Sequence, residues 1–116
     1  ILTAGTMYFV TKRLEISAAH RLELDYPSKC TSLHGHNWIV TVHCRSKELN
    51  ANGMVTDFTE IKELVAGKFD HKVLNDTVDF NPTAENLARY LCENIANCFR
   101  VDVQESEGNV ASYCID

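Results

Sequence analysis

Two stretches near the N-terminus alternate between apolar and polar residues, which is typical of half-buried β-strands. In the first, residues 8–20, the apolar side chains share one parity: Tyr8, Val10, Leu14, Ile16 and Ala18, with His20 last. In the second, from His34 to about Arg45, the even positions form another mostly apolar row: His34, His36, Trp38, Val40, Val42 and Cys44. We therefore predict two strands joined by a polar loop, with histidines at the ends of their buried rows.

Two amphipathic helices are predicted in the middle of the chain. Asp57 is a suitable N-cap, and Glu60 three residues later nearly completes a capping box. The stripe that follows is apolar: Phe58, Ile61, Leu64, Val65 and Phe69, with Gly67 expected to fray the helix end. A loop through Asn75-Asp76 leads to the second helix, which should start near Asn81-Pro82-Thr83 with the proline at or near its first position. The face of this helix is again apolar: Ala84, Leu87, Ala88, Leu91, Ile95 and Cys98.

The chain ends in a predicted hairpin. Residues 101–106 and 110–115 are the strands, and Glu107-Gly108-Asn109 is the turn. The order of two strands, two helices and two strands predicts an α+β domain, a four-stranded antiparallel sheet with both helices on one face. We expect residues 8–116 to form this single domain. Residues 1–7 lack the basic flank and length of a signal peptide, and we expect them to be an N-terminal extension or an expression remnant.

The segment from Cys30 to His36 concentrates the candidate chemistry. His34 and His36 are two residues apart, so on a strand they point to the same face. His20, at the end of the neighbouring row, can bring a third imidazole. A single histidine in a strand is usually an ordinary residue, but three of the five histidines gather here beside Cys30. Three imidazoles leave a tetrahedral zinc ion one open position, as in catalytic sites, so we predict zinc on these three residues.

Three further groups carry chemistry, each with a plainer alternative. Cys30 places a thiol near the open position, where a cation would lower its pKa and let it act as a base, or it is an ordinary buried cysteine. The adjacent Asp70 and His71 would suit a proton relay, or they simply end a helix. Glu105 closes the apolar row of Val101 and Val103, where a carboxylate needs a partner unless that strand end is exposed to water.

Composition narrows the function classes. The chain has 116 residues, a size at which one domain gains stability from oligomerisation. Its net charge of −5 argues against a nucleic-acid-binding protein, and no apolar run approaches the length of a membrane span. Five scattered cysteines suit free thiols in a reducing cytosol, so we expect a cytoplasmic protein. Four basic residues lie near the histidine segment in sequence, and we expect them to form either a solvated rim or a binding site for substrate phosphates: Lys12, Arg13, Arg21 and Lys29.

Six motifs in this order resemble the family of 6-pyruvoyl-tetrahydropterin and 6-carboxytetrahydropterin synthases. The resemblance covers about residues 8–115, and the motifs are Ser17-Ala18-Ala19-His20-Arg21-Leu22, Cys30 with His34-Gly35-His36-Asn37, Gly53-Met54-Val55-Thr56-Asp57-Phe58, Asp70-His71-Lys72-Val73-Leu74-Asn75, Asn81-Pro82-Thr83-Ala84-Glu85-Asn86, and Val103-Gln104-Glu105-Ser106. Each motif is weak by itself, but six in order are highly specific.

The resemblance implies the tunnelling fold (T-fold), in which three chains close their sheets into a barrel and two trimers stack into a hexamer. It implies zinc on the three histidines and active sites between subunits. Cys30 would abstract a proton, Asp70 and His71 would relay protons, and Glu105 would hold the pterin ring and join the relay. Thr83 matches a position near the pterin. The substrate would be 7,8-dihydroneopterin triphosphate.

The short spacing from Cys30 to His34 resembles the bacterial, carboxy-forming branch of the family. This branch makes 6-carboxytetrahydropterin for queuosine and other 7-deazaguanines. Two alternatives remain open at this stage. The chain could be the sibling enzyme that makes the pyruvoyl compound, or a structural zinc module in which Cys30 is the fourth ligand and no reaction occurs.

Overall fold

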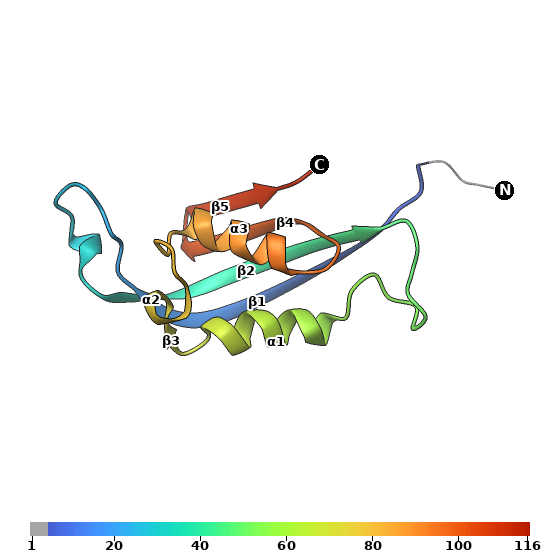
Figure 1. Cartoon of the computed structure of the whole chain (residues 1–116), viewed down its shortest axis with the longest axis horizontal. Helices are drawn as coiled ribbons and strands as arrows, with labels where there is room; N and C mark the ends of the chain where they lie inside the picture. The colour runs from blue at the N-terminus through green and yellow to red at the C-terminus, as the bar shows by residue number, and fades with distance from the viewer. Residues whose placement is uncertain (1–4) are drawn as a thin grey trace.

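The computed structural model describes residues 5–116, so residues 1–4 of the predicted N-terminal extension lie outside the described residues (Figure 1). The elements are β1 (Tyr8–His20), a 3-10 turn (Lys29–Thr31), β2 (His34–Ser46), α1 (Phe58–Phe69), β3 (Lys72–Val73), α2 (Leu74–Thr77), α3 (Ala84–Asn94), β4 (Cys98–Ser106) and β5 (Asn109–Cys114). The α+β class is confirmed.

The sheet has five strands in the order β3-β1-β2-β4-β5. β1 and β2 form a long antiparallel hairpin whose register is unbroken from the pair Tyr8 and Ser46 to the pair His20 and His34. The prediction of a purely antiparallel, four-stranded sheet is wrong, because β3 adds to the β1 edge in parallel. Two residues are too few to show an alternating pattern, so this strand could not be predicted from the hydrophobic pattern.

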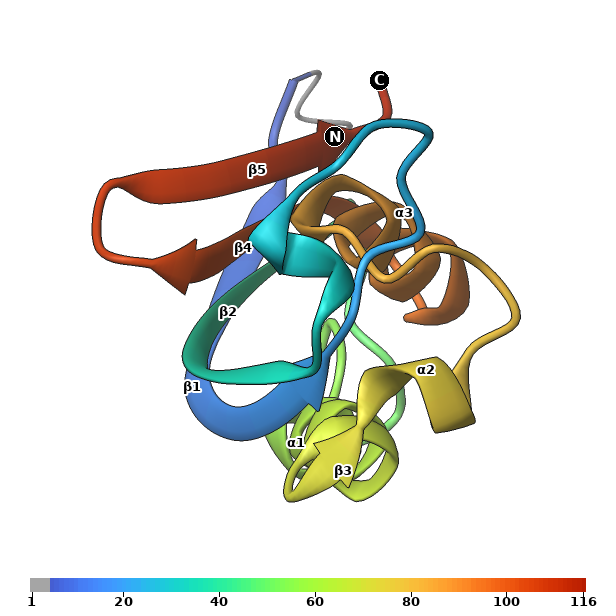
Figure 2. The same ribbon diagram turned by 90° about the vertical axis from the view of Figure 1, so that its left-hand side faces the viewer.

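The two longer helices, α1 and α3, cover the same face of the sheet, as predicted (Figure 2). The alternating rows of the strands supply one half of the core: Ile16, Ala18, Trp38, Val40, Val42, Val101 and Val103. The helices supply the other half: Ile61, Val65 and Phe69 from α1, and Leu87, Ala88 and Leu91 from α3. Burying each such side chain contributes about 1.5–3 kcal/mol. The parity that buries Ile16 and Ala18 also fixes the face on which His20 must lie.

The first helix begins where its cap predicts. The Asp57 side chain accepts a hydrogen bond from the Thr59 N–H (2.8 Å), and the helix runs on to Phe69. Gly67 does not fray it, because the buried Phe69 anchors the last turn. The expected loop after β3 is in part the one-turn helix α2, closed by the Val78 N–H bonding to the Leu74 carbonyl.

The second predicted helix, α3, begins near the predicted start but ends earlier than expected. Thr83 is its N-cap, and Pro82 lies one residue before the cap, close to the first helical position. The helix ends at Asn94, and Ile95 is its C-cap. Cys98, predicted on the apolar face of this helix, instead opens β4, because Asn97 takes a left-handed conformation (φ 63°) that turns the chain back to the sheet.

All five cysteines are free in the structure. Cys44, Cys92 and Cys98 are buried between the sheet and α3, Cys30 is half-buried, and Cys114 is exposed. Within residues 5–116, no helix is both long and apolar enough to cross a membrane.

Candidate metal centre and active site

Four side chains converge at the loop end of the long hairpin. His20 comes from β1, His34 and His36 from β2, and Glu105 from β4, and the atoms that each could offer to a metal lie within 4.8 Å of one another. His20 and His34 are direct cross-strand partners, which brings their ring centroids to 4.6 Å. Strand register therefore assembles three of the four groups, and we call these four residues the metal-ligand cluster.

Backbone carbonyls orient two of the imidazoles. The Nδ1–H of His20 donates to the Pro82 carbonyl (2.8 Å), and the Nδ1–H of His34 donates to the Ser32 carbonyl (2.8 Å). A carbonyl can only accept, so Nδ1 must carry the proton and Nε2 keeps its lone pair. Metal-binding histidines are held by the same kind of hydrogen bond in known sites. Sequence reasoning missed Pro82 and Ser32, because a backbone carbonyl leaves no signature in residue type.

Two ring nitrogens in the cluster are buried without a hydrogen-bond partner. They are Nε2 of His20, whose residue is 0% exposed, and Nε2 of His36. Buried polar atoms are nearly always satisfied. The Glu105 carboxylate lies 3.2 Å from His36 Nε2 without forming a hydrogen bond to it, so both nitrogens call for an explanation. Imidazole nitrogens and one carboxylate are the donor set that zinc accepts. The residues present therefore fit a zinc ion.

Burial also favours the form of His20 that binds metal. Desolvation lowers its pKa below the ordinary value, and the neighbouring imidazoles of His34 and His36 lower it further. The Pro82 carbonyl and the Glu105 carboxylate oppose that shift without reversing it. A neutral imidazole is the ligand form, so His20 needs to lose no proton at neutral pH to accept a cation.

Glu105 reaches the cluster from a β-bulge. The register between β4 and β5 shifts between Gln104 and Ser106, and such bulges commonly re-aim a side chain. The Glu105 carboxylate lies 3.2 Å from Nε2 of His36, and its side chain is 30% exposed. It is therefore no freely solvated strand end. Glu105 also lines a cavity of about 440 Å³, together with Ala84 and Glu85 of α3 and the β4–β5 turn.

Cys30 lies near the cluster in sequence but outside it in space. The 3-10 turn holds it half-buried, with its N–H donating to the Ser28 hydroxyl (3.1 Å). Its carbonyl accepts from the Leu22 N–H (2.9 Å). Its sulfur is not among the atoms that gather within 4.8 Å. The structure thus offers Glu105, rather than Cys30, as the fourth possible metal ligand.

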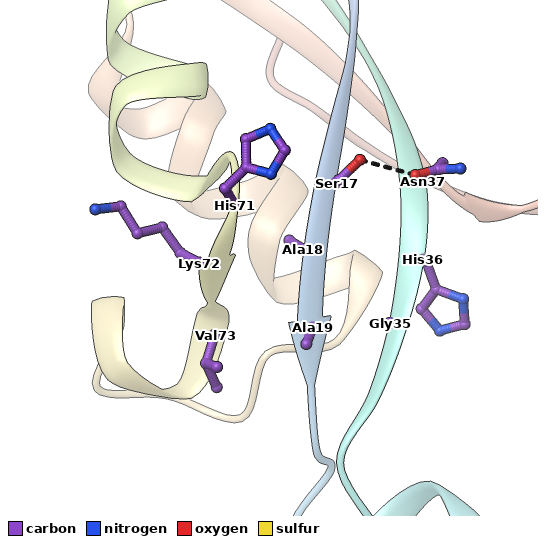
Figure 3. Close-up of a pocket in the computed structure, with 9 residues that line it drawn as sticks. All are labelled: Ser17, Ala18, Ala19, Gly35, His36, Asn37, His71, Lys72 and Val73. Atoms are coloured by element: carbon purple, nitrogen blue, oxygen red, sulfur yellow. Dashed lines mark hydrogen bonds between the residues drawn. The ribbon is translucent and has the colours of Figure 1, made fainter.

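Asp70 and His71 do not join the cluster of their own chain. The Asp70 carboxylate accepts from the Ser17 N–H (2.9 Å), and the His71 ring, 83% exposed, lies 3.7 Å from that carboxylate. His71 lines a cavity of about 520 Å³ at the β1 edge, and His36 of the metal-ligand cluster lines it too. In Figure 3 the rings of His71 and His36 stand on opposite sides of the β1–β2 pair. His71 has a positive φ of 58°, a strained conformation that turns the chain from α1 into β3.

Comparison with known proteins gives the chain its family. The family profile described as "6-pyruvoyl tetrahydropterin synthase" matches residues 9–115. The chain belongs to this family. The match spans every element of the fold and all four residues of the metal-ligand cluster.

Individual members of the family are similar over most of the chain. The 6-carboxy-5,6,7,8-tetrahydropterin synthase of Bacillus subtilis is 31% identical, covering 91% of this chain and 82% of that protein. The 6-pyruvoyl tetrahydrobiopterin synthase of Drosophila melanogaster is 32% identical, covering 90% and 78%. The solved 6-pyruvoyl tetrahydropterin synthase of Caenorhabditis elegans superposes with a TM-score of 0.75 at 27% identity, covering 96% and 97%. The T-fold implied by the motifs is confirmed.

Two further groups that the sequence singled out are Thr83 and the four basic residues. Thr83 is the N-cap of α3, and its hydroxyl accepts the Asn86 N–H (3.1 Å). The expected basic group is divided: Arg21 and Lys29 stand next to His20 and Cys30 in the chain, whereas Lys12 and Arg13 lie far from the site. Lys12 and Arg13 pair with Val42 and Thr41 in the middle of the hairpin, roughly 25 Å along the strand from His20 at about 3.3 Å per residue. Proximity in sequence misled here, because an extended strand separates residues faster than any other element.

Proposed function

We propose that this protein is a zinc-dependent lyase that converts 7,8-dihydroneopterin triphosphate and one water molecule to 6-carboxy-5,6,7,8-tetrahydropterin, acetaldehyde and triphosphate. The observation that carries this proposal is the cluster of three oriented imidazoles and Glu105, which opens beside a cavity. Membership of the family and the similarity to the Bacillus subtilis carboxytetrahydropterin synthase support the substrate and product.

The three histidines hold the metal, with Pro82 and Ser32 setting the orientation of two rings. Bound zinc supplies Lewis acidity that polarises the side-chain oxygens of the substrate. Cys30 acts as the base that removes a proton from the substrate side chain. Its thiol needs no role as a ligand, which agrees with its position outside the metal-ligand cluster.

Glu105 holds the pterin ring. Two carboxylate oxygens can accept two parallel hydrogen bonds from a guanidine-like ring edge. The cavity of about 440 Å³ beside Glu105 has the size of a small-ligand site. Thr83 lies one residue before Ala84, which lines the same cavity, so its place near the pterin is compatible with its capping of α3.

Asp70 and His71 serve the Cys30 of a neighbouring subunit. Within one chain, this pair lies at the β1 edge and contacts Ser17 rather than the cluster. The active site is therefore completed by a second copy, in a hexamer of two stacked trimers. There the pair would relay the proton that Cys30 removes.

The sibling reaction, which forms the pyruvoyl compound, is the competing candidate, and the similarity to the Drosophila melanogaster enzyme favours it. Both reactions need the metal and the thiolate, but the carboxy branch also breaks a carbon–carbon bond, as in a retro-aldol step. The short segment between Cys30 and His34 sets where the thiolate stands. We assign the carboxy branch, and with it a place in queuosine (7-deazaguanine) synthesis in the cytoplasm, from this spacing.

Product analysis tests the proposal. The zinc-loaded protein is incubated with 7,8-dihydroneopterin triphosphate, acetaldehyde is trapped with a hydrazine, and the pterins are identified by mass spectrometry. We expect 6-carboxytetrahydropterin and acetaldehyde in equal amounts. Pyruvoyl-tetrahydropterin without acetaldehyde would move the chain to the sibling branch. Unchanged substrate would leave a structural zinc site, closed by Glu105, as the better explanation.

A further inference from the structure

The segment that follows His20 is held by side chains in place of a strand. In an extended chain, alternate residues direct their N–H and C=O groups to the same edge. At the β1 edge, Ser17 bonds to Asp70 and His71, and Ala19 pairs with Val73 of β3. The partner strand β3 ends at Val73. Beyond it, the side chains of two asparagines, Asn75 and Asn81, make the hydrogen bonds that a partner strand would make.

Each asparagine satisfies both backbone groups of one residue. The Arg21 N–H donates to Oδ1 of Asn75 (2.9 Å), and the Arg21 carbonyl accepts from Nδ2 of the same side chain (2.9 Å). Asn81 makes the same pair of bonds to Glu23, at 2.9 and 3.0 Å. A side-chain amide carries one acceptor and two donors in a plane, so it can replace the backbone of a neighbouring strand residue.

Leu22, between these two clamped residues, directs its backbone to the opposite edge. There its N–H donates to the carbonyl of Cys30 (2.9 Å). On its other side the turn that carries Cys30 is tied to the cluster, because the Ser32 carbonyl accepts from the His34 ring. The backbone around Cys30 is therefore held on both sides. Leu22, fixed by Asn75 and Asn81 (the asparagine clamps), bonds to the Cys30 carbonyl, and the Ser32 carbonyl bonds to His34.

We propose that Asn75 and Asn81 are positioning residues, which fix the Arg21–Glu23 segment and through Leu22 set where the Cys30 thiol stands relative to the metal-ligand cluster. This inference rests on the proposed role of Cys30 as the base. Neither asparagine touches the cluster. Their effect on turnover passes through the backbone of residues 21–23, and proton transfer depends steeply on such placement.

The test uses Asn75→Ala, Asn81→Ala and the double variant, in a Cys114→Ser background that leaves Cys30 as the accessible thiol. Asn50→Ala is the matched control, since Asn50 also bonds backbone N–H groups, but in the turn of Asn52 and Met54. Amide hydrogen exchange at Leu22 reports directly whether its N–H stays bonded to the Cys30 carbonyl. Alkylation of Cys30 by iodoacetamide at pH 9 reports its exposure, because an ordinary thiol is largely ionised there.

We expect exchange at Leu22 and alkylation of Cys30 to become about tenfold faster in the double variant. Turnover number should fall about tenfold while KM stays within about twofold, since substrate binding is not the step affected. Zinc content should remain that of the parent, because the variants leave the side chains of His20, His34, His36 and Glu105 in place. The Asn50 control should match the parent in every measurement. The single variants should show intermediate effects, and they carry the test if the double variant does not fold.

The proposal is overturned if Leu22 exchange and Cys30 alkylation stay within about twofold of the parent. It is equally overturned if both rise while turnover is unchanged, because the segment would then be held for stability alone. The exchange and alkylation measurements need no substrate. A parent protein that does not convert the pterin would therefore refute the proposed function, while these two measurements still decide whether the clamps hold Cys30.

Discussion

Cys30 and the histidines differ in what their removal should do. We expect Cys30→Ala to retain zinc and lose turnover by about 10²–10⁴-fold, the usual contribution of a general base. His34→Ala is the matched variant and should lose zinc, because it removes one of the three proposed ligands, whose ring the Ser32 carbonyl orients. Metal analysis at neutral pH, together with initial rates, checks both. A Cys30→Ala protein that purifies without metal would make the thiol a ligand.

Glu105 faces two ways, toward His36 and toward the cavity. We expect Glu105→Gln to raise KM at least about tenfold while zinc content stays near that of the parent, because an amide accepts only one of the two hydrogen bonds that the pterin edge offers. Titration of the variant with zinc gives the comparison. If zinc affinity falls and KM does not change, Glu105 is the fourth ligand and the site is closed.

At the scale of elements, the face of the sheet opposite the helices carries a polar network. Asp102 on β4 accepts hydrogen bonds from His43, Arg100 and Ser112, the first two at 2.8 and 2.9 Å. Burial by itself would raise the pKa of this carboxyl, but the hydrogen bonds from Ser112, His43 and Arg100 outweigh burial and hold the pKa below its usual value. The network thus joins three neighbouring strands at their middle.

This shift has a defined pH dependence. A carboxyl with a lowered pKa binds its proton more weakly in the folded state, so it stabilises the fold above about pH 4 and loses that contribution as the pH falls through its folded pKa. We expect Asp102→Asn to unfold more easily at pH 7, by on the order of 1 kcal/mol. Its stability should also decline less steeply below pH 4. Urea unfolding of metal-free protein between about pH 7 and 2 measures both. Parallel curves for the variant and the parent would contradict this.

The elements also show what the sequence could predict. Residues 8–20 and 34–46 alternate over many positions, so their strands, their buried face and the convergence of His20, His34 and His36 follow from period alone. β3 and α2 could not be predicted, because two and four residues carry no period. The membership of Glu105 in the cluster depends on a bulge, and the orientation of His20 depends on the Pro82 carbonyl sixty-two positions away. Neither contact is local.

At the scale of the whole molecule, two sheet edges are open among residues 5–116. Within this part of the chain β5 pairs only with β4, and β3 covers β1 only at Ala18 and Ala19. Open edges invite pairing with another chain. The exposed His71 ring at the β1 edge belongs to the same surface. Assembly through these edges would bring one chain's Asp70 and His71 to another chain's Cys30.

Mixing two inactive variants tests this assembly. Cys30→Ala and His71→Ala oligomers are each expected to be inactive; dissociated and reassembled together in equal amounts, they should recover about a quarter of the parent activity, because about a quarter of shared sites then receive both intact residues. Light scattering of the same samples should show a hexamer. If each site used residues of one chain only, no mixture could recover activity. A monomer in solution would also contradict the prediction.

The long hairpin has a consequence for the order in which the protein folds. Its register places His20 opposite His34, so the three imidazoles meet through contacts that are close in sequence. Closing a short loop costs little entropy, and hairpins form within about 1–10 μs, well before distant segments pair. The three imidazoles can therefore come together before α3 and β4 pack against the hairpin. Zinc, if bound at that stage, would stabilise the hairpin early in folding, and Pro82 and Glu105 would complete the site last.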